Sequence, residues 1–127
     1  MYRWMKADEG KPRLGDRFGL LGVRPKGRAG RSDVDAQYPT DLVLASLPKG
    51  MSCSFDPTIP QRPGDDFFLW EIDSDSLGSD LVLERAPTAN NPTHCMIKPK
   101  RDTTLFDYQN ALASTRNEWR LIQVEVA

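Results

Sequence analysis

Residues 104–126 read TLFDYQNALASTRNEWRLIQVEV, and this stretch decides the fold class. Thr104 is a residue type favoured at helix N-caps, and Asp107 stands three residues later in the capping-box position. Large apolar residues at 105, 108 and 112 follow at helical spacing, so one helix face can pack on a sheet. From residue 119 to residue 126 the pattern changes to alternation, which predicts a last strand after one long helix.

The chain before this helix is broken into short segments. All ten prolines and all nine glycines precede residue 100, which keeps regular elements short. Residues 51–55 form the clearest strand, because Met51, Cys53 and Phe55 alternate with two serines. We also predict strands at 1–5, 67–72, 81–85 and 95–98, a strand or helical turn at 41–45, and a capped helical turn at 73–77. This order predicts an α+β fold with a small, mostly antiparallel or mixed sheet.

Length and composition indicate a single domain covering residues 1–127. Hydrophobic residues make up 39% and charged residues 28% of the chain, which excludes a disordered or membrane-spanning class. The first six residues are not followed by the apolar segment of a signal peptide. We therefore expect a soluble, cytoplasmic chain without membrane contact.

The charge balance bears on possible partners. A net charge of −1, from 17 basic and 18 acidic residues, disfavours a general nucleic-acid binder. The charges are unevenly spread: basic residues predominate from Lys6 to Arg31, whereas residues 65–80 hold six acids and no base. The basic segment can form a patch that faces an anionic ligand.

Strong catalytic and metal-binding motifs are absent from the sequence. It contains no phosphate-binding Gly-x-x-x-x-Gly-Lys loop, no Gly-x-Ser-x-Gly elbow and no Gly-x-Gly-x-x-Gly segment. Cys53 and Cys95 form no Cys-x-x-Cys motif, and the single histidine, His94, cannot complete a usual four-ligand zinc site. We expect no metal and expect both cysteines to be small buried side chains.

Two polar patterns lie on predicted strands in the first half of the chain. Arg3 stands between Tyr2 and Trp4 and lies on the opposite face of the predicted strand from them. If that face lines a cleft, the planar guanidinium can form two hydrogen bonds to a phosphate. The plainer interpretation is a solvated arginine on an edge strand. Ser52 and Ser54 share one strand face, where they either line a pocket or form an ordinary polar surface.

A third polar pattern lies on the last predicted strand. Gln123 and Glu125 fall on one strand face. A carboxylate in a cleft can hold a ribose hydroxyl and stabilise a developing oxocarbenium ion; the alternative is the polar face of a frayed chain end. His94 precedes the 95–98 strand, where it can contact a nucleotide or simply end the turn.

The three patterns together resemble the ADP-ribosyltransferase toxin superfamily, in which Tyr-Arg lies on the first strand, Ser-x-Ser on a middle strand and Gln-x-Glu on a late strand. More narrowly, segment 50–56 is similar to one in the small type VI secretion effector family of that superfamily. The motif His94-x-Met96-Ile97-x-Pro99, followed by a helix and Trp119, is similar to the end of that family's domain.

The resemblance implies a use for each candidate residue. Arg3 would contact the phosphates of NAD, Ser52 and Ser54 would support the NAD pocket, Glu125 would be catalytic, and Gln123 would shape target choice. It also implies a macromolecular target, a cognate immunity protein and delivery of a toxin into a target cell.

Two other functions remain open on the sequence alone. The acidic residues 65–80 and the proline-rich loops are compatible with a non-enzymatic binding module, such as an adaptor or an immunity-type partner of a secreted effector. The basic segment from Lys11 to Arg31 can hold RNA phosphates, but Phe18 is its only aromatic residue, so base stacking is poorly supported.

Overall fold

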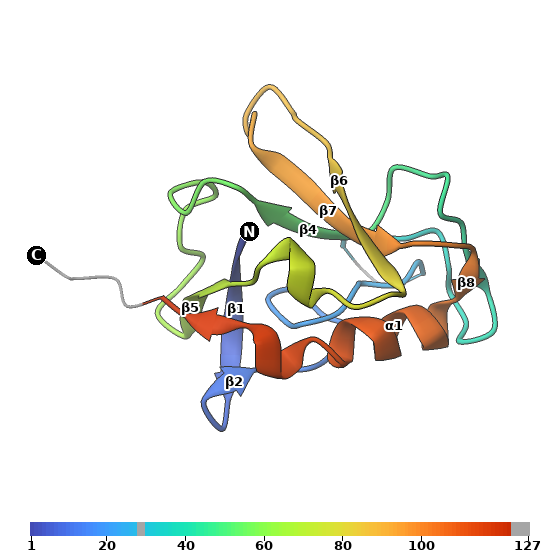
Figure 1. The fold of residues 1–127 in the computed structure, drawn as a ribbon, viewed down its shortest axis with the longest axis horizontal. Helices are drawn as coiled ribbons and strands as arrows, with labels where there is room; N and C mark the ends of the chain where they lie inside the picture. Colours follow the sequence, from blue (N-terminus) through green and yellow to red (C-terminus); the bar gives the residue numbers. More distant parts are fainter. Residues whose placement is uncertain (28–29, 123–127) are drawn as a thin grey trace, which may run out of the picture.

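The computed structural model describes residues 1–27 and 30–122 (Figure 1). Its strands are β1 (Tyr2–Asp8), β2 (Lys11–Pro12), β3 (Leu42–Val43), β4 (Met51–Ser54), β5 (Phe67–Glu71), β6 (Leu81–Arg85), β7 (His94–Pro99), β8 (Thr103–Thr104) and β9 (Arg120–Leu121). The helices are α1 (Leu105–Ala113) and two 3₁₀ turns, η1 (Ser74–Ser76) and η2 (Arg116–Glu118).

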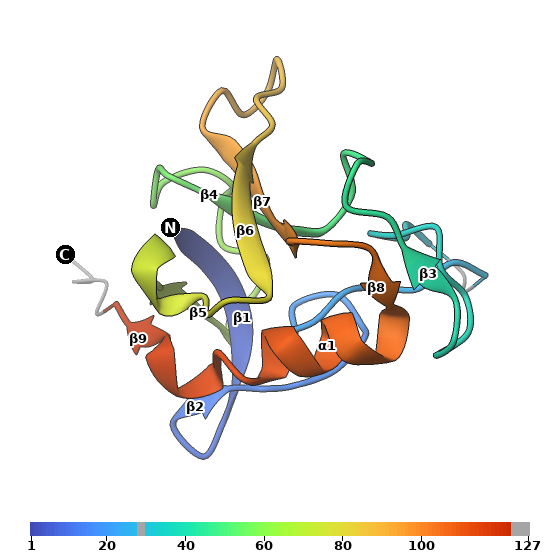
Figure 2. The ribbon, with the colours of Figure 1, turned by 45° about the vertical axis from the view of Figure 1, so that its right-hand side comes forward.

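The predicted α+β class is confirmed by the sheet topology. The main sheet has the strand order β6-β7-β4-β1-β5-β9, with β2 pairing to the end of β1. Every strand pairing in it is antiparallel. The short strands β3 and β8 form a separate two-stranded sheet beside the start of α1 (Figure 2). The β6–β7 hairpin stands away from the body of the molecule in both views.

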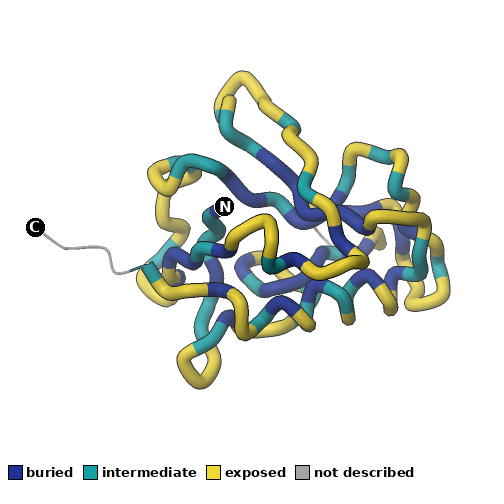
Figure 3. The backbone as a smooth tube through the Cα atoms, viewed as in Figure 1, coloured by how far each residue is buried: buried dark blue, intermediate teal, exposed yellow. Residues whose placement is uncertain are grey.

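The helix begins as the sequence predicts. The Thr104 hydroxyl accepts a hydrogen bond from the backbone N–H of Asp107, which satisfies one of the free donors of the first turn. Leu105, Tyr108 and Leu112 form the buried stripe of α1. Figure 3 shows that buried residues gather where the helix faces the sheet, whereas the tip of the β6–β7 hairpin is exposed.

The Tyr108 hydroxyl joins the helix to two strands. It donates to the carbonyl of Ile97 on β7 and accepts from the backbone N–H of Met51 on β4. All three residues are buried, so these backbone groups have no access to water. Tyr108 therefore fixes the position of α1 against the β4–β7 pair.

Replacement of Tyr108 by phenylalanine is expected to lower the free energy of unfolding by about 2–4 kcal/mol, because it leaves a buried N–H and a buried carbonyl without this partner. Urea denaturation measures this loss. Tyr38→Phe is the matched control, since Tyr38 is exposed and its variant should differ from wild type by less than about 0.5 kcal/mol. Equal stabilities of the two variants would contradict the bridging role of Tyr108.

Some predicted boundaries differ from the observed ones. The helix α1 has nine residues and is shorter than the long helix that the sequence predicts. The 3₁₀ turn η2 follows it and leads into β9. Only two residues of the predicted last strand, Arg120 and Leu121, form β9, and Gln123 and Glu125 lie outside the described residues. The helical turn at 74–76 is present, but its N-cap residue Asp73 makes no side-chain capping bond because its carboxylate binds Arg120. None of the helices in the described ranges has the length and apolar character needed to cross a membrane.

The neighbouring strands with the fewest paired positions in the main sheet are β1 and β4. These neighbours share one paired position, Tyr2 with Ser54, whereas β1 pairs with β5 from Tyr2 through Lys6. Beyond Tyr2 the strands β1 and β4 therefore diverge and leave backbone groups on their facing edges without a strand partner. Arg3 is the first residue past this last shared pair.

Candidate functional site

Arg3 closes the gap where β1 and β4 diverge. Its Nη1 donates to the carbonyl of Ser52 at 2.6 Å, and its Nη2 donates to the carbonyl of Leu20 at 3.0 Å. The guanidinium thus binds the Ser52 carbonyl of β4, which lies beyond the one paired position of β1 and β4. The Nε atom is sealed from solvent and has no hydrogen-bond partner. An arginine with an unused, enclosed donor is uncommon and points to a site rather than to a surface side chain.

The positive charge of Arg3 has no carboxylate partner within the described residues. Burial lowers the pKa of its guanidinium below the ordinary value, and the charge of nearby Asp33 opposes that shift. Asp33 itself is held by Arg24 through two bonds, Nη2–Oδ1 at 2.9 Å and Nε–Oδ2 at 3.1 Å. This forked pair raises the pKa of Arg24. One carboxylate therefore faces two arginines, which leaves the site positive.

Arg3 lines a cleft of about 300 Å³ with aromatic side chains in its walls. Trp4 is held by a hydrogen bond from its indole Nε1 to the carbonyl of Pro60 at 2.9 Å. Phe18 is 59% exposed, yet the Arg24 guanidinium lies 5.7 Å from its ring centroid and the Phe67 ring lies 5.6 Å away. These contacts hold both rings in the wall of the cleft, where they can meet a planar ligand.

A second hollow of about 520 Å³ adjoins this cleft. The two share the lining residues Arg24, Arg31, Asp33, Ser52 and His94. The second hollow adds Lys49, which pairs with Asp35 at 2.7 Å, and polar residues from the β6–β7 turn. Arg31 is exposed, lines both hollows and makes no ion pair within the described part of the chain. Together the two hollows are lined by four cations, Arg3, Arg24, Arg31 and Lys49.

His94 stands at the junction of the two hollows. Its Nδ1 lies 2.8 Å from the carbonyl of Ala86. A carbonyl can only accept, so Nδ1 carries the proton of this bond and Nε2 of the neutral ring is an acceptor. The β6–β7 hairpin thus holds the ring in one orientation. His94 is suited to accept a hydrogen bond from a hydroxyl in the cleft.

The two serines of β4 have different environments. Ser52 is half-buried and lines both hollows, while its carbonyl binds Arg3. Ser54 is buried, and its hydroxyl contacts the Thr93 hydroxyl at 2.8 Å and accepts from the backbone N–H of Asp56 at 3.1 Å. Ser54 therefore holds Thr93, at the end of the loop between β6 and β7, and is not among the residues that line the cleft.

The structure brings together three of the six candidate residues, namely Arg3, Ser52 and His94. Gln123 and Glu125 lie outside the described residues. Sequence analysis missed the Arg24–Asp33 pair and the wall positions of Trp4 and Phe18. The excess of basic residues between Lys6 and Arg31 gave a weak signal for Arg24, whereas nothing in the sequence singles out Asp33.

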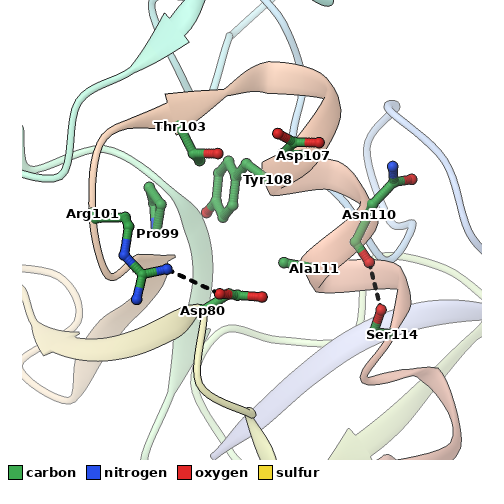
Figure 4. Close-up of a pocket in the computed structure, with 9 residues that line it drawn as sticks. All are labelled: Asp80, Pro99, Arg101, Thr103, Asp107, Tyr108, Asn110, Ala111 and Ser114. Atoms are coloured by element: carbon green, nitrogen blue, oxygen red, sulfur yellow. Dashed lines mark hydrogen bonds and ion pairs between the residues drawn. The ribbon is translucent and has the colours of Figure 1, made fainter.

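A separate cavity of about 390 Å³ lies between α1 and the end of the β6–β7 pair (Figure 4). Its one ion pair, Arg101 with Asp80, is about two-thirds exposed on both sides. Ser114 donates to the Asn110 carbonyl, and the Tyr108 hydroxyl already binds two strands. This cavity has no enclosed polar atom in need of a ligand, so it is a weaker candidate than the cleft.

Comparison with known proteins adds no homologue. The chain matches no protein family, no curated protein and no solved structure. Functional inference therefore rests on the cleft itself and on the three candidate residues that line it, Arg3, Ser52 and His94.

Proposed function

We propose that this chain is an NAD-binding domain of the ADP-ribosyltransferase type, and that it acts as a toxin of the secreted-effector kind. The proposal rests on the environment of Arg3. This partly buried cation lies where β1 and β4 diverge, and its Nε has no hydrogen-bond partner. A site of this kind suits an anion, and the paired phosphates of a dinucleotide are such an anion.

The chemical character of the cleft fits NAD in three respects. The volumes of the two adjoining hollows fall within the range of roughly 300–1,000 Å³ typical of ligand sites. Arg3 and Arg31 supply positive charge without a carboxylate partner in the described residues. Trp4 and Phe18 offer ring faces to a base, and Nε2 of His94 offers an acceptor to a ribose hydroxyl.

NAD, when bound, supplies an activated ribosyl group whose bond to nicotinamide can break. In this scheme Arg3 would bind the phosphates, and its hydrogen bond to the Ser52 carbonyl would keep the guanidinium in one orientation. The rings of Trp4 and Phe18 would pack against part of the bound dinucleotide. By the resemblance in sequence, the Glu125 carboxylate would supply the negative charge that favours transfer of the ribosyl group to a nucleophile of the target.

Calorimetric titration with NAD tests the proposal. We expect saturable binding by the wild-type chain and weaker binding at high salt, because the contact is largely ionic. ADP-ribose should compete, since it keeps both phosphates. The absence of binding by folded protein at millimolar NAD would rule the proposal out.

A smaller contribution is expected from Arg31. Because Arg31 is exposed and makes no ion pair in the described ranges, Arg31→Gln should leave the unfolding free energy unchanged within about 0.5 kcal/mol. It should weaken NAD binding by roughly 2–5-fold, the effect of one exposed charge at the rim of the site. Arg13→Gln is the control, because Arg13 is exposed and lines neither hollow. Equal losses of NAD affinity in the two variants would mean that the effect comes from the overall charge of the chain and not from a contact of Arg31 with NAD.

The non-enzymatic binding module gains less support from the contacts. Several acids of residues 65–80 already have partners: Asp66 pairs with Lys6, Asp80 with Arg101, and both Glu71 and Asp73 with Arg120. The acidic stretch therefore presents much less free charge than its sequence indicates. A pull-down that returns one stoichiometric protein partner, without NAD cleavage, would favour this alternative.

A further inference from the structure

The two cysteines lie face to face on neighbouring strands. Cys53 of β4 and Cys95 of β7 are 42 residues apart in the chain and occupy directly opposed positions in the register. Their sulfur atoms are 2.9 Å apart. The two strands run side by side in both views of the ribbon (Figures 1 and 2). Burial of two apolar thiols does not require this direct contact between the sulfurs.

The surroundings of the pair favour ionisation of one thiol. The two sulfurs share one hydrogen bond, in which either sulfur can be the donor. This bond lowers the pKa of Cys95 and, together with burial, raises the pKa of Cys53. Arg3 lies near Cys53, and the N-terminus and Arg85 lie near Cys95; each of these positive charges favours a thiolate. Thiolates beside cations are the reactive form of cysteine.

The Arg3 cleft lies on the Cys53 side of the pair. Cys53 is 5% exposed and belongs to the wall of the Arg3 cleft, whereas Cys95 is fully buried behind it. A small oxidant such as a peroxide can enter a hollow of about 300 Å³. No group of three metal-binding side chains occurs among the residues the structure describes, so the pair has no further ligand for a usual zinc site.

We propose that Cys53 and Cys95 are a peroxide-oxidisable pair that closes into an intramolecular disulfide between β4 and β7. Peroxide meets the Cys53 sulfur first, because Cys53 lines the cleft and Cys95 does not. The proton shared between the two sulfurs moves to Cys95, and the Cys53 thiolate attacks the peroxide. The O–O bond breaks, an S–O bond forms to give a sulfenic acid, and the leaving oxygen takes the proton back from Cys95 and departs as water. The Cys95 sulfur then attacks the Cys53 sulfur, an S–S bond forms, the S–O bond breaks and a second water leaves. Two thiols and one peroxide thus give one disulfide and two waters.

This bond ties together the two strands that carry the cleft residues. Ser52 lies next to Cys53 on β4, and His94 lies next to Cys95 on β7. Oxidation therefore fixes the wall of the cleft while it links chain segments 42 residues apart. A covalent link of that span restricts the unfolded chain, so the oxidised form is expected to melt at a temperature roughly 10 °C higher.

Mass spectrometry of the folded wild-type chain after peroxide treatment tests the proposal. We expect a loss of about two mass units, no thiol available for alkylation after unfolding, and restoration of both thiols by dithiothreitol. Peptide mapping should recover residues 53 and 95 in one cross-linked fragment. Two alkylatable thiols after treatment, or cross-links only between separate chains, would overturn it.

The single-cysteine variants supply the matched control. In Cys95→Ala the remaining Cys53 has no partner, so peroxide should give a sulfenic acid that a dimedone reagent traps, with no loss of two mass units. In Cys53→Ala the remaining Cys95 is fully buried and should react much more slowly. Trapping of sulfenic acid in the wild type at the level of Cys95→Ala would show that Cys95 does not resolve it. None of these outcomes depends on NAD binding.

Discussion

Replacement of Arg3 by lysine is expected to weaken NAD binding by roughly 30-fold or more. Lysine keeps the charge but loses the planar fork, so one amine cannot bind both the Ser52 and Leu20 carbonyls and also face a phosphate. A charge-assisted bond contributes about 2 kcal/mol, which corresponds to this factor in Kd. Calorimetric titration of both proteins with NAD measures the change.

Arg116→Lys provides the matched control for Arg3. Arg116 also donates to two backbone carbonyls, those of Pro12 at 2.9 Å and Asp8 at 2.7 Å, but it lies away from the cleft. Both variants should therefore lose similar stability in urea, and only the Arg3 variant should lose NAD affinity. Equal affinity of the Arg3 variant and the wild type would mean that the guanidinium is purely structural.

Replacement of Glu125 by glutamine is expected to reduce ADP-ribosyl transfer by about 100-fold or more while NAD binding changes little. The amide keeps the size of the side chain but removes the negative charge that would stabilise a sugar cation in the transition state. Release of nicotinamide, followed with and without a target-cell lysate, measures the chemical step. Binding is measured separately by calorimetry, so that a loss of activity is not confused with a loss of affinity.

Glu118→Gln tests whether the effect belongs to residue 125. Glu118 is exposed in η2 and lines neither hollow. Its variant should transfer ADP-ribose at the wild-type rate, and cells that express it should stop growing as with the wild type. Full activity in the Glu125 variant would remove this residue from the mechanism and leave the cleft without its assigned carboxylate.

The elements with strong local signals could be predicted from the sequence. The Thr104 cap and the apolar stripe of α1 depend on neighbours within one or two turns, so the sequence pattern reports them directly. The strand at 81–85 coincides with β6, and the alternation at 51–55 corresponds to β4 with Met51 and Cys53 buried. Buried cysteines were also predicted, and the structure confirms them.

The cleft could not be predicted in the same way, because it depends on which strands become neighbours. Alternation marks Arg3 as lying on a strand but does not reveal that β1 and β4 share one paired position. Phe18, Arg24 and Asp33 belong to a segment with little regular structure, where no periodicity indicates their orientation. The convergence of Arg3 with Ser52 and His94 rests on long-range pairing, which a sequence pattern does not contain.

The most direct test of the central claim is a titration of the isotope-labelled chain with NAD, followed by nuclear magnetic resonance. If the cleft holds NAD, the largest shifts will fall on the Arg3 guanidinium, the Trp4 indole N–H and the backbone amides of Ser52 and His94. Shifts clustered instead around Asp80 and Arg101 in the cavity of Figure 4, or no shifts at saturating NAD, would contradict the account.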